Sequence, residues 1–159
     1  MDKRLLLDTI VGEIMSSFNA SLAAADQARK TATSKENVAE NKYDTLGLEA
    51  AYLAHGQSER VLQLESDLAS YLALRKNIKN DSAVAVGSVL KLKLAAGHSR
   101  YLFVGPASGG LVVKIKSVKV TVITPESPLG KAVLGSIVGD ELTSELGGIY
   151  ADSLVNAIW

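Results

Sequence analysis

The spacing of apolar residues changes once along this chain, and the change divides it into two parts. Up to about residue 76 the apolar positions recur every three or four residues, and after Asn77 they alternate with polar ones. The first spacing is typical of amphipathic α-helices and the second of half-buried β-strands. The sequence therefore predicts an α+β protein with a helical domain at residues 1–80 and a β domain at residues 81–159.

The first part carries two helical stripes. One extends from Leu7 to Ala25 and predicts a helix over residues 3–29, and the other extends from Leu46 to Tyr71. Two long helices that each have one narrow apolar stripe bury it most simply by folding back on each other. We therefore expect an antiparallel helical hairpin, a coiled coil, with its tip at residues 31–44.

The second part predicts a small, mostly antiparallel sheet and one short helix. The expected strands lie within residues 84–94, 99–104, 110–115 and 118–123, separated by glycine-containing turns. Ser127 as N-cap, Pro128 in the first turn and Gly135 just past the end predict a helix over residues 127–134. The tail at 150–159 alternates poorly, which leaves a helix and a last strand both open.

Composition narrows the classes of function. The formal net charge is zero, which argues against a free-standing nucleic-acid binder held mainly by counterion release. There are no cysteines, so disulfides and thiolate metal sites are excluded. No signal peptide and no apolar run of about 20 residues is present, so we expect a cytoplasmic protein without membrane contact.

The sequence offers no catalytic or metal-binding motif of its own. His55 and His98 have no second ligand at metal spacing, and no serine stands in a nucleophile elbow. We expect no cofactor and no metal site in the isolated chain.

One stretch is basic without any acid. Residues 82–125 contain no Asp or Glu, and alternation along the strands would put several of their basic side chains on one solvent-facing surface. Such a surface suits an acidic protein or RNA, but an antiparallel sheet also needs polar residues there, and both interpretations stay open. Few aromatic residues accompany them, which argues against a base-stacking platform. The basic residues are Lys91, Lys93, Arg100, Lys114, Lys116 and Lys119.

The segment from Ile123 to Glu141, ITPESPLGKAVLGSIVGDE, closely resembles the C-terminal signature of the bacterial GreA/GreB transcript-cleavage factors. Family members have an N-terminal helical hairpin and a C-terminal domain with an FKBP-like fold, a division that the two periods also predict. The resemblance implies a divergent transcription elongation factor that binds RNA polymerase at its secondary channel. It implies no intrinsic enzyme, at most stimulation of the RNA cleavage activity of the polymerase, and indirect contact with nascent RNA.

The resemblance also implies where the polymerase docks. The matching family segment lies near the docking surface on the rim of the secondary channel. The candidate docking residues are Ser127, Pro128, Leu129, Gly130 and Lys131.

The hairpin tip departs from the family pattern. Family members carry two acids there, which help to hold a catalytic magnesium ion in the polymerase, but here Thr33 stands where the aspartate belongs. A second alignment puts Asn37 at that position. In a helical tip, three acids spaced by four residues would share one face as a replacement acidic cluster. Alternatively, a capping box with Thr33 explains Glu36, and a solvated helix face explains the other two acids, without any function. The tip candidates are Glu36, Asn37, Glu40, Asn41 and Asp44.

Three functions follow from these observations. The first is rescue of backtracked polymerase by transcript cleavage, with any magnesium shared with the polymerase active centre. The alternative is a non-cleaving regulator that competes with true Gre factors, as the missing aspartate suggests. A distant third is an FKBP-type peptidyl-prolyl isomerase, which requires a deep aromatic pocket that this half of the chain is poorly equipped to build.

Overall fold

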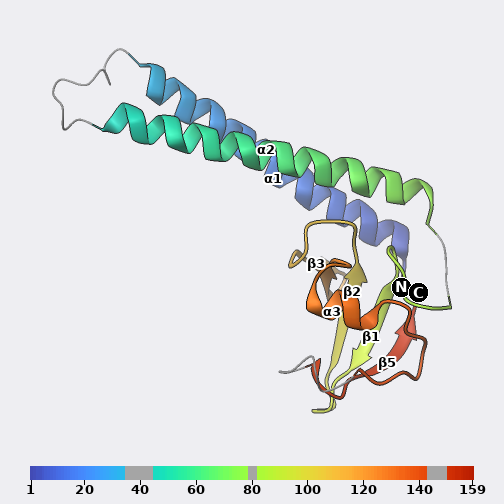
Figure 1. The fold of residues 1–159 in the computed structure, drawn as a ribbon. Coiled ribbons are helices and arrows are strands. Elements are labelled where there is room, and N and C mark those ends of the chain that lie inside the picture. Colours follow the sequence, from blue (N-terminus) through green and yellow to red (C-terminus); the bar gives the residue numbers. More distant parts are fainter. Residues whose placement is uncertain (35–44, 79–81, 143–149) are drawn as a thin grey trace. The chain divides into compact units, whose positions relative to one another are not determined.

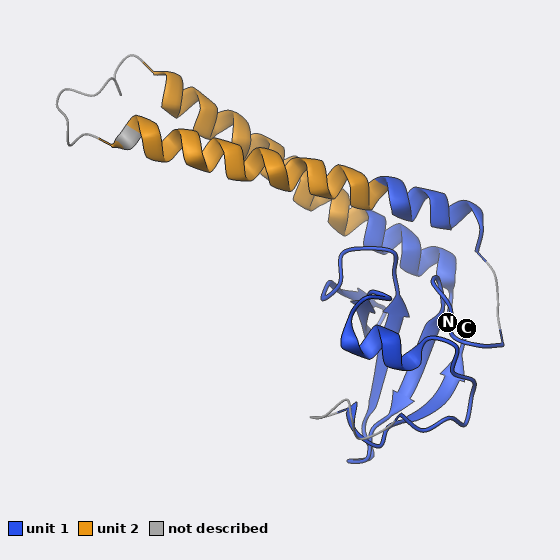
Figure 2. Cartoon of the chain, viewed as in Figure 1, with its two compact units in different colours: residues 1–11, 69–159 blue, residues 12–68 orange. Residues whose placement is uncertain are grey.

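The computed structural model describes residues 1–34, 45–78, 82–142 and 150–159. The chain forms two compact units, shown in Figure 2. We call residues 12–68 the hairpin unit, and residues 1–11 together with 69–159 the sheet unit. The domain boundary near residue 80 stays a prediction, and the sheet unit also includes both ends of the helical part.

Two helices of 31 residues each make up most of the helical part: α1, Lys3–Thr33, and α2, Leu46–Lys76 (Figure 1). The carboxylate of Asp2 caps α1, because its Oδ1 accepts hydrogen bonds from the amides of Arg4 and Leu5 at 3.0 and 3.1 Å. The helix continues one turn beyond the predicted end at residue 29, since no glycine or proline interrupts residues 30–33. The predicted helical hairpin is confirmed.

The apolar stripes of the hairpin unit are partly as predicted. Ile14, Ala50 and Leu64 are buried, but Leu22 and Leu53 are 49% and 56% exposed although the stripe pattern includes them. Asp67 is a buried charged residue of this unit. A charged residue is normally exposed on such a helix, but Asp67 is only 5% exposed, and its carboxylate accepts a 2.7 Å hydrogen bond from the side-chain amide of Gln63. A buried carboxylate needs such a partner to offset the loss of hydration.

Within the described residues, the sheet has five strands in the order β3-β4-β2-β1-β5. Three of its four pairings are antiparallel, whereas β2 and β4 run parallel, so the prediction of a mostly antiparallel sheet is confirmed. β2 and β4 run parallel because the loop at 105–111 carries the chain from β2 past the position of β4 to the edge strand β3, from which the chain turns back into β4. The strands are β1, Val89–Lys93; β2, Ser99–Val104; β3, Val112–Ile115; β4, Val118–Ile123; and β5, Leu154–Ile158.

One face of the sheet packs against the short helix α3, Pro128–Val133 (Figure 1). Strand alternation sends Leu92, Leu102 and Ile123 to this face, where they meet Val133 of the helix in a buried cluster. Burial of each such side chain contributes about 1.5–3 kcal/mol. The cluster fixes α3, and with it the segment before it, on the sheet.

The opposite face receives the end of α2. The ring of Tyr71 stacks on Phe103 with 6.4 Å between centroids, and its hydroxyl donates a 2.8 Å hydrogen bond to the carbonyl of Ala107. Tyr71 is fully buried. A Cβ at Gly105 would collide with the Tyr71 hydroxyl, so the glycine allows the loop after β2 to turn beside this ring.

The C-terminal tail resolves the choice that the sequence left open. It forms β5, which pairs antiparallel with β1. The pairing register shifts between Lys91 and Leu92, and a bulge of this kind breaks strict alternation. This irregularity explains why the tail does not look like a strand in the sequence.

Candidate functional site

Ser127 organises the segment that enters α3. Its backbone is extended, with φ −67° and ψ 151°, and its Oγ accepts a hydrogen bond from the Gly130 amide at 3.0 Å. The same hydroxyl donates to the carbonyl of Thr124 at 2.7 Å. The predicted N-cap is therefore confirmed, and it ties the start of the helix to the end of β4.

Gly130 must be a glycine for a reason that the sequence does not reveal. The residue is buried, and a Cβ built on it would collide with the carbonyl oxygen of Thr124 and lie 2.9 Å from the Ser127 Oγ. Because a backbone carbonyl cannot move aside without breaking the turn, no larger residue fits. Gly130 therefore shapes the segment and does not present a side chain to a partner.

The other candidate docking residues are available for contact in different degrees. Pro128 and Lys131 are exposed, while Leu129 is half-buried and packs against the core cluster. Of the five residues that the sequence selects, these three offer side chains at the surface, whereas Ser127 and Gly130 hold the backbone. Their role in docking stays a prediction.

An open groove of about 330 Å³ adjoins this segment. Its walls come from the loop before β3, from β4 and from the segment itself, so residues distant in sequence meet there. The sequence reasoning missed Thr121 and Tyr150, because only the strand pairing and the fold of the tail bring them to this place. The lining residues are Gly109, Gly110, Thr121, Val122, Ile123, Thr124, Ser127, Pro128, Leu129 and Tyr150.

The tip candidates Glu36, Asn37, Glu40, Asn41 and Asp44 lie outside the described residues. Thr33 is described, and it is the last residue of α1. Its hydroxyl donates to the carbonyl of Arg29 at 2.9 Å. Thr33 thus ends α1, while its capping-box partner Glu36 lies outside the described residues, so the capping-box interpretation stays a prediction.

Two acids in the described residues near the tip are already engaged. The carboxylate of Asp26 forms ion pairs with Lys30 at 2.7 Å and Arg29 at 3.3 Å. The hydrogen bond and the charge of Lys30 hold the pKa of Asp26 below its usual value, so the carboxylate stays ionised. At the start of α2, the Thr45 hydroxyl donates a 2.7 Å hydrogen bond to the carboxylate of Glu49. Both carboxylates are thus bonded to neighbouring side chains, whereas a divalent cation such as Mg²⁺ is bound through one or two carboxylates.

Metal ligands do not gather anywhere in the described part of the chain: no group of three His, Asp or Glu side chains there is placed to hold a metal ion.

None of the helices, over their described residues, combines the length and apolar character needed to cross a membrane.

Comparison with known proteins gives solved structures but no family model and no curated protein. The chain is similar to GreA factor homolog 1 (Gfh1) of Thermus thermophilus, with 21% identity over 94% of both chains and a TM-score of 0.37. It is also similar to Gfh1 of Thermus aquaticus, with 21% identity over 92% of both chains and a TM-score of 0.37. A third structure, of the transcription factor Gfh1, has 21% identity, 93% and 92% coverage and a TM-score of 0.38.

Proposed function

We propose that this chain is a Gre-like transcription factor that binds RNA polymerase at the rim of its secondary channel and modulates elongation. The sequence signature at 123–141 supports this proposal, and so does the arrangement of a helical hairpin followed by a sheet domain. In this proposal the sheet unit docks, and the hairpin tip determines what happens in the channel.

The observation that carries the proposal is that, within residues 127–131, some residues fix the backbone while others expose their side chains. Two hydrogen bonds of the Ser127 hydroxyl and the close packing of Gly130 hold the backbone. Pro128 and Lys131 project from this fixed backbone beside an open groove. Side chains held on a rigid element lose little conformational entropy on binding, which favours affinity.

The test is binding to RNA polymerase core in a pull-down and by biolayer interferometry. We expect the wild-type chain to bind and the double variant Pro128→Ala, Lys131→Glu to bind at least about tenfold more weakly, as expected for loss of central interface contacts. Lys93→Glu, an exposed charge change on the other face of the sheet, is the control and should bind normally. Failure of the wild-type chain to bind would remove the proposal.

A second candidate, a regulator that occupies the channel without supporting cleavage, is favoured by Thr33. The residue takes the place of the family aspartate and uses its hydroxyl within α1. A threonine cannot supply the negative charge of a metal ligand. Nascent-RNA cleavage by backtracked polymerase distinguishes the two: stimulation at saturating protein supports rescue, whereas inhibition of cleavage stimulated by a true Gre factor supports the regulator.

A further inference from the structure

Three cationic side chains form a row across neighbouring strands of the sheet. Lys114 of β3 lies directly opposite Lys119 of β4. The parallel register pairs Tyr101 with Val120, so Arg100 of β2 lies one step earlier, beside Lys119. All three residues are exposed. We call Arg100, Lys114 and Lys119 the basic row.

The basic row lies on the same face of the sheet as α3. Leu102, two residues after Arg100, belongs to the buried cluster under that helix, and side chains two apart on a strand share a face. Lys91 and Lys93 alternate with the buried Leu92 and therefore belong to the opposite face. The six basic residues of this stretch thus do not form one common surface, but three of them do.

The row is unfavourable for the isolated sheet. Neighbouring strands are about 4.8 Å apart, and like charges directly opposite each other destabilise a strand pair. Residues 82–125, all of them described, contribute no carboxylate. Among the ion pairs between described residues, none involves the basic row. The sheet therefore has a local excess of positive charge that an external anion would relieve.

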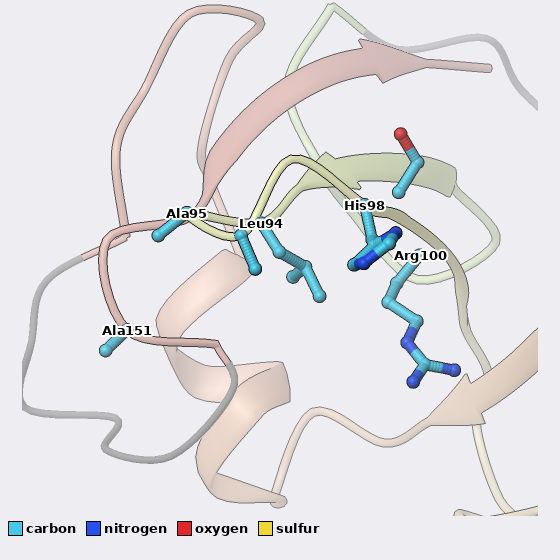
Figure 3. A pocket seen from close by; sticks show the side chains of 7 residues that line it. Leu94, Ala95, His98, Arg100 and Ala151 are labelled. Carbon is cyan, nitrogen blue, oxygen red and sulfur yellow. The ribbon is translucent and has the colours of Figure 1, made fainter.

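The row is continuous with the proposed docking surface. Lys119 and Thr121 alternate along β4 on one face, and Thr121 lines the groove beside Ser127 and Leu129. At its other end, Arg100 lines a hollow of about 530 Å³ together with His98, as Figure 3 shows. A partner lying in the groove along β4 would thus reach the row without crossing other elements.

The chemistry of the row favours a protein partner over RNA. Recognition of single-stranded RNA usually combines cations with aromatic rings on which bases stack. Tyr101, the aromatic residue next to Arg100, faces the other side of the sheet and stacks on Trp159 with 6.3 Å between centroids. By contrast, carboxylates three or four residues apart on a helix have Cβ atoms about 5–6 Å apart, close to the spacing of the strands.

We propose that the basic row binds the acidic face of a helix of the docking partner. This helix lies across β3, β4 and β2, next to the groove. The inference rests on the proposed function, in which the partner is RNA polymerase. Charges at the rim of an interface mainly increase the rate of association, and their effect falls with ionic strength. The row therefore steers the docking that Pro128, Leu129 and Lys131 complete.

The test compares two double variants. The first, Lys114→Gln with Lys119→Gln, neutralises two charges of the basic row, and the control, Lys91→Gln with Lys93→Gln, neutralises two charges on the opposite face of the sheet. We expect the first variant to associate with RNA polymerase core about 5–10-fold more slowly in low salt and to match the wild type at about 0.5 M salt. The control should associate as the wild type does. The first variant should also unfold at an equal or higher temperature, because a repulsion has been removed; misfolding therefore cannot explain slower association.

Three results would overturn the inference. If the wild type binds polymerase and the row variant associates at the same rate in low salt, the row has no steering role, while the proposed function stands. If the wild type does not bind, both proposals fail together. If a fluorescein-labelled single-stranded RNA binds the wild type without polymerase and the row variant loses this binding, the row belongs to RNA and not to a protein helix.

Discussion

Gly130 would matter at the proposed docking site through the backbone that it shapes, because it has no side chain to offer a partner. A methyl group at this position would collide with the Thr124 carbonyl. We expect Gly130→Ala to lower the free energy of unfolding by about 2–3 kcal/mol, in the range of overpacked sites. Urea unfolding measures this change, and weaker polymerase binding should accompany it. Lys131→Ala, an exposed change in the same helix, should alter stability by less than about 0.5 kcal/mol.

The local part of the candidate site was predictable from sequence, but its surroundings were not. A serine followed by proline specifies an N-cap within a few residues, and the structure has that cap. The collision at Gly130 depends on Thr124, which the fold returns to the helix. Arg100 and Lys119 are neighbours only because β2 and β4 are parallel. Contacts that arise from strand order leave no periodic signal in the sequence.

At the scale of the element, the glycine in the middle of α2 weakens the helix without a visible structural need. A Cβ added at Gly56 would have no heavy atom within 4 Å, and the residue is exposed. Gly56→Ala should therefore raise the free energy of unfolding by about 1 kcal/mol, because alanine loses less backbone entropy in a helix. Circular dichroism during urea unfolding measures the effect.

Gly97 provides the opposite control, because it too has open space around the added Cβ but a φ of +82°. Gly97→Ala should destabilise the protein by about 1 kcal/mol, since an L-residue is strained in this left-handed conformation. Equal effects of the two substitutions would show that backbone conformation does not decide them.

The elements themselves followed from periodicity wherever one face of an element is buried. Both long helices, the four strands from β1 to β4 and α3 appear near their predicted positions. The first strand starts later than predicted, at Val89, because Gly87 turns the chain with a φ of 94°. The sequence did not decide between a helix and a strand for β5, because the pairing of β5 with β1 is irregular. Periodicity fails where a bulge or a turn interrupts the alternation.

At the scale of the whole molecule, the sheet unit depends on residues far from it in sequence. The unit includes residues 1–11 and 69–76 as well as the strands. Leu6, Leu7 and Ile10 at the start of the chain are at most 1% exposed, as is Tyr71 near the end of α2. A sheet domain that begins at residue 81 would lack all four side chains.

This dependence predicts that Tyr71→Ala in the full chain lowers the free energy of unfolding by about 3–5 kcal/mol, as loss of a large buried ring does. Tyr71→Phe should cost only about 1 kcal/mol, because it removes the hydrogen bond to Ala107 but keeps the stacking on Phe103. A fragment of residues 81–159 should unfold at much lower urea concentration than the full chain, without a sharp transition. A fragment as stable as the full chain would instead establish residues 81–159 as an independent domain, and Tyr71 would then serve the helices more than the sheet.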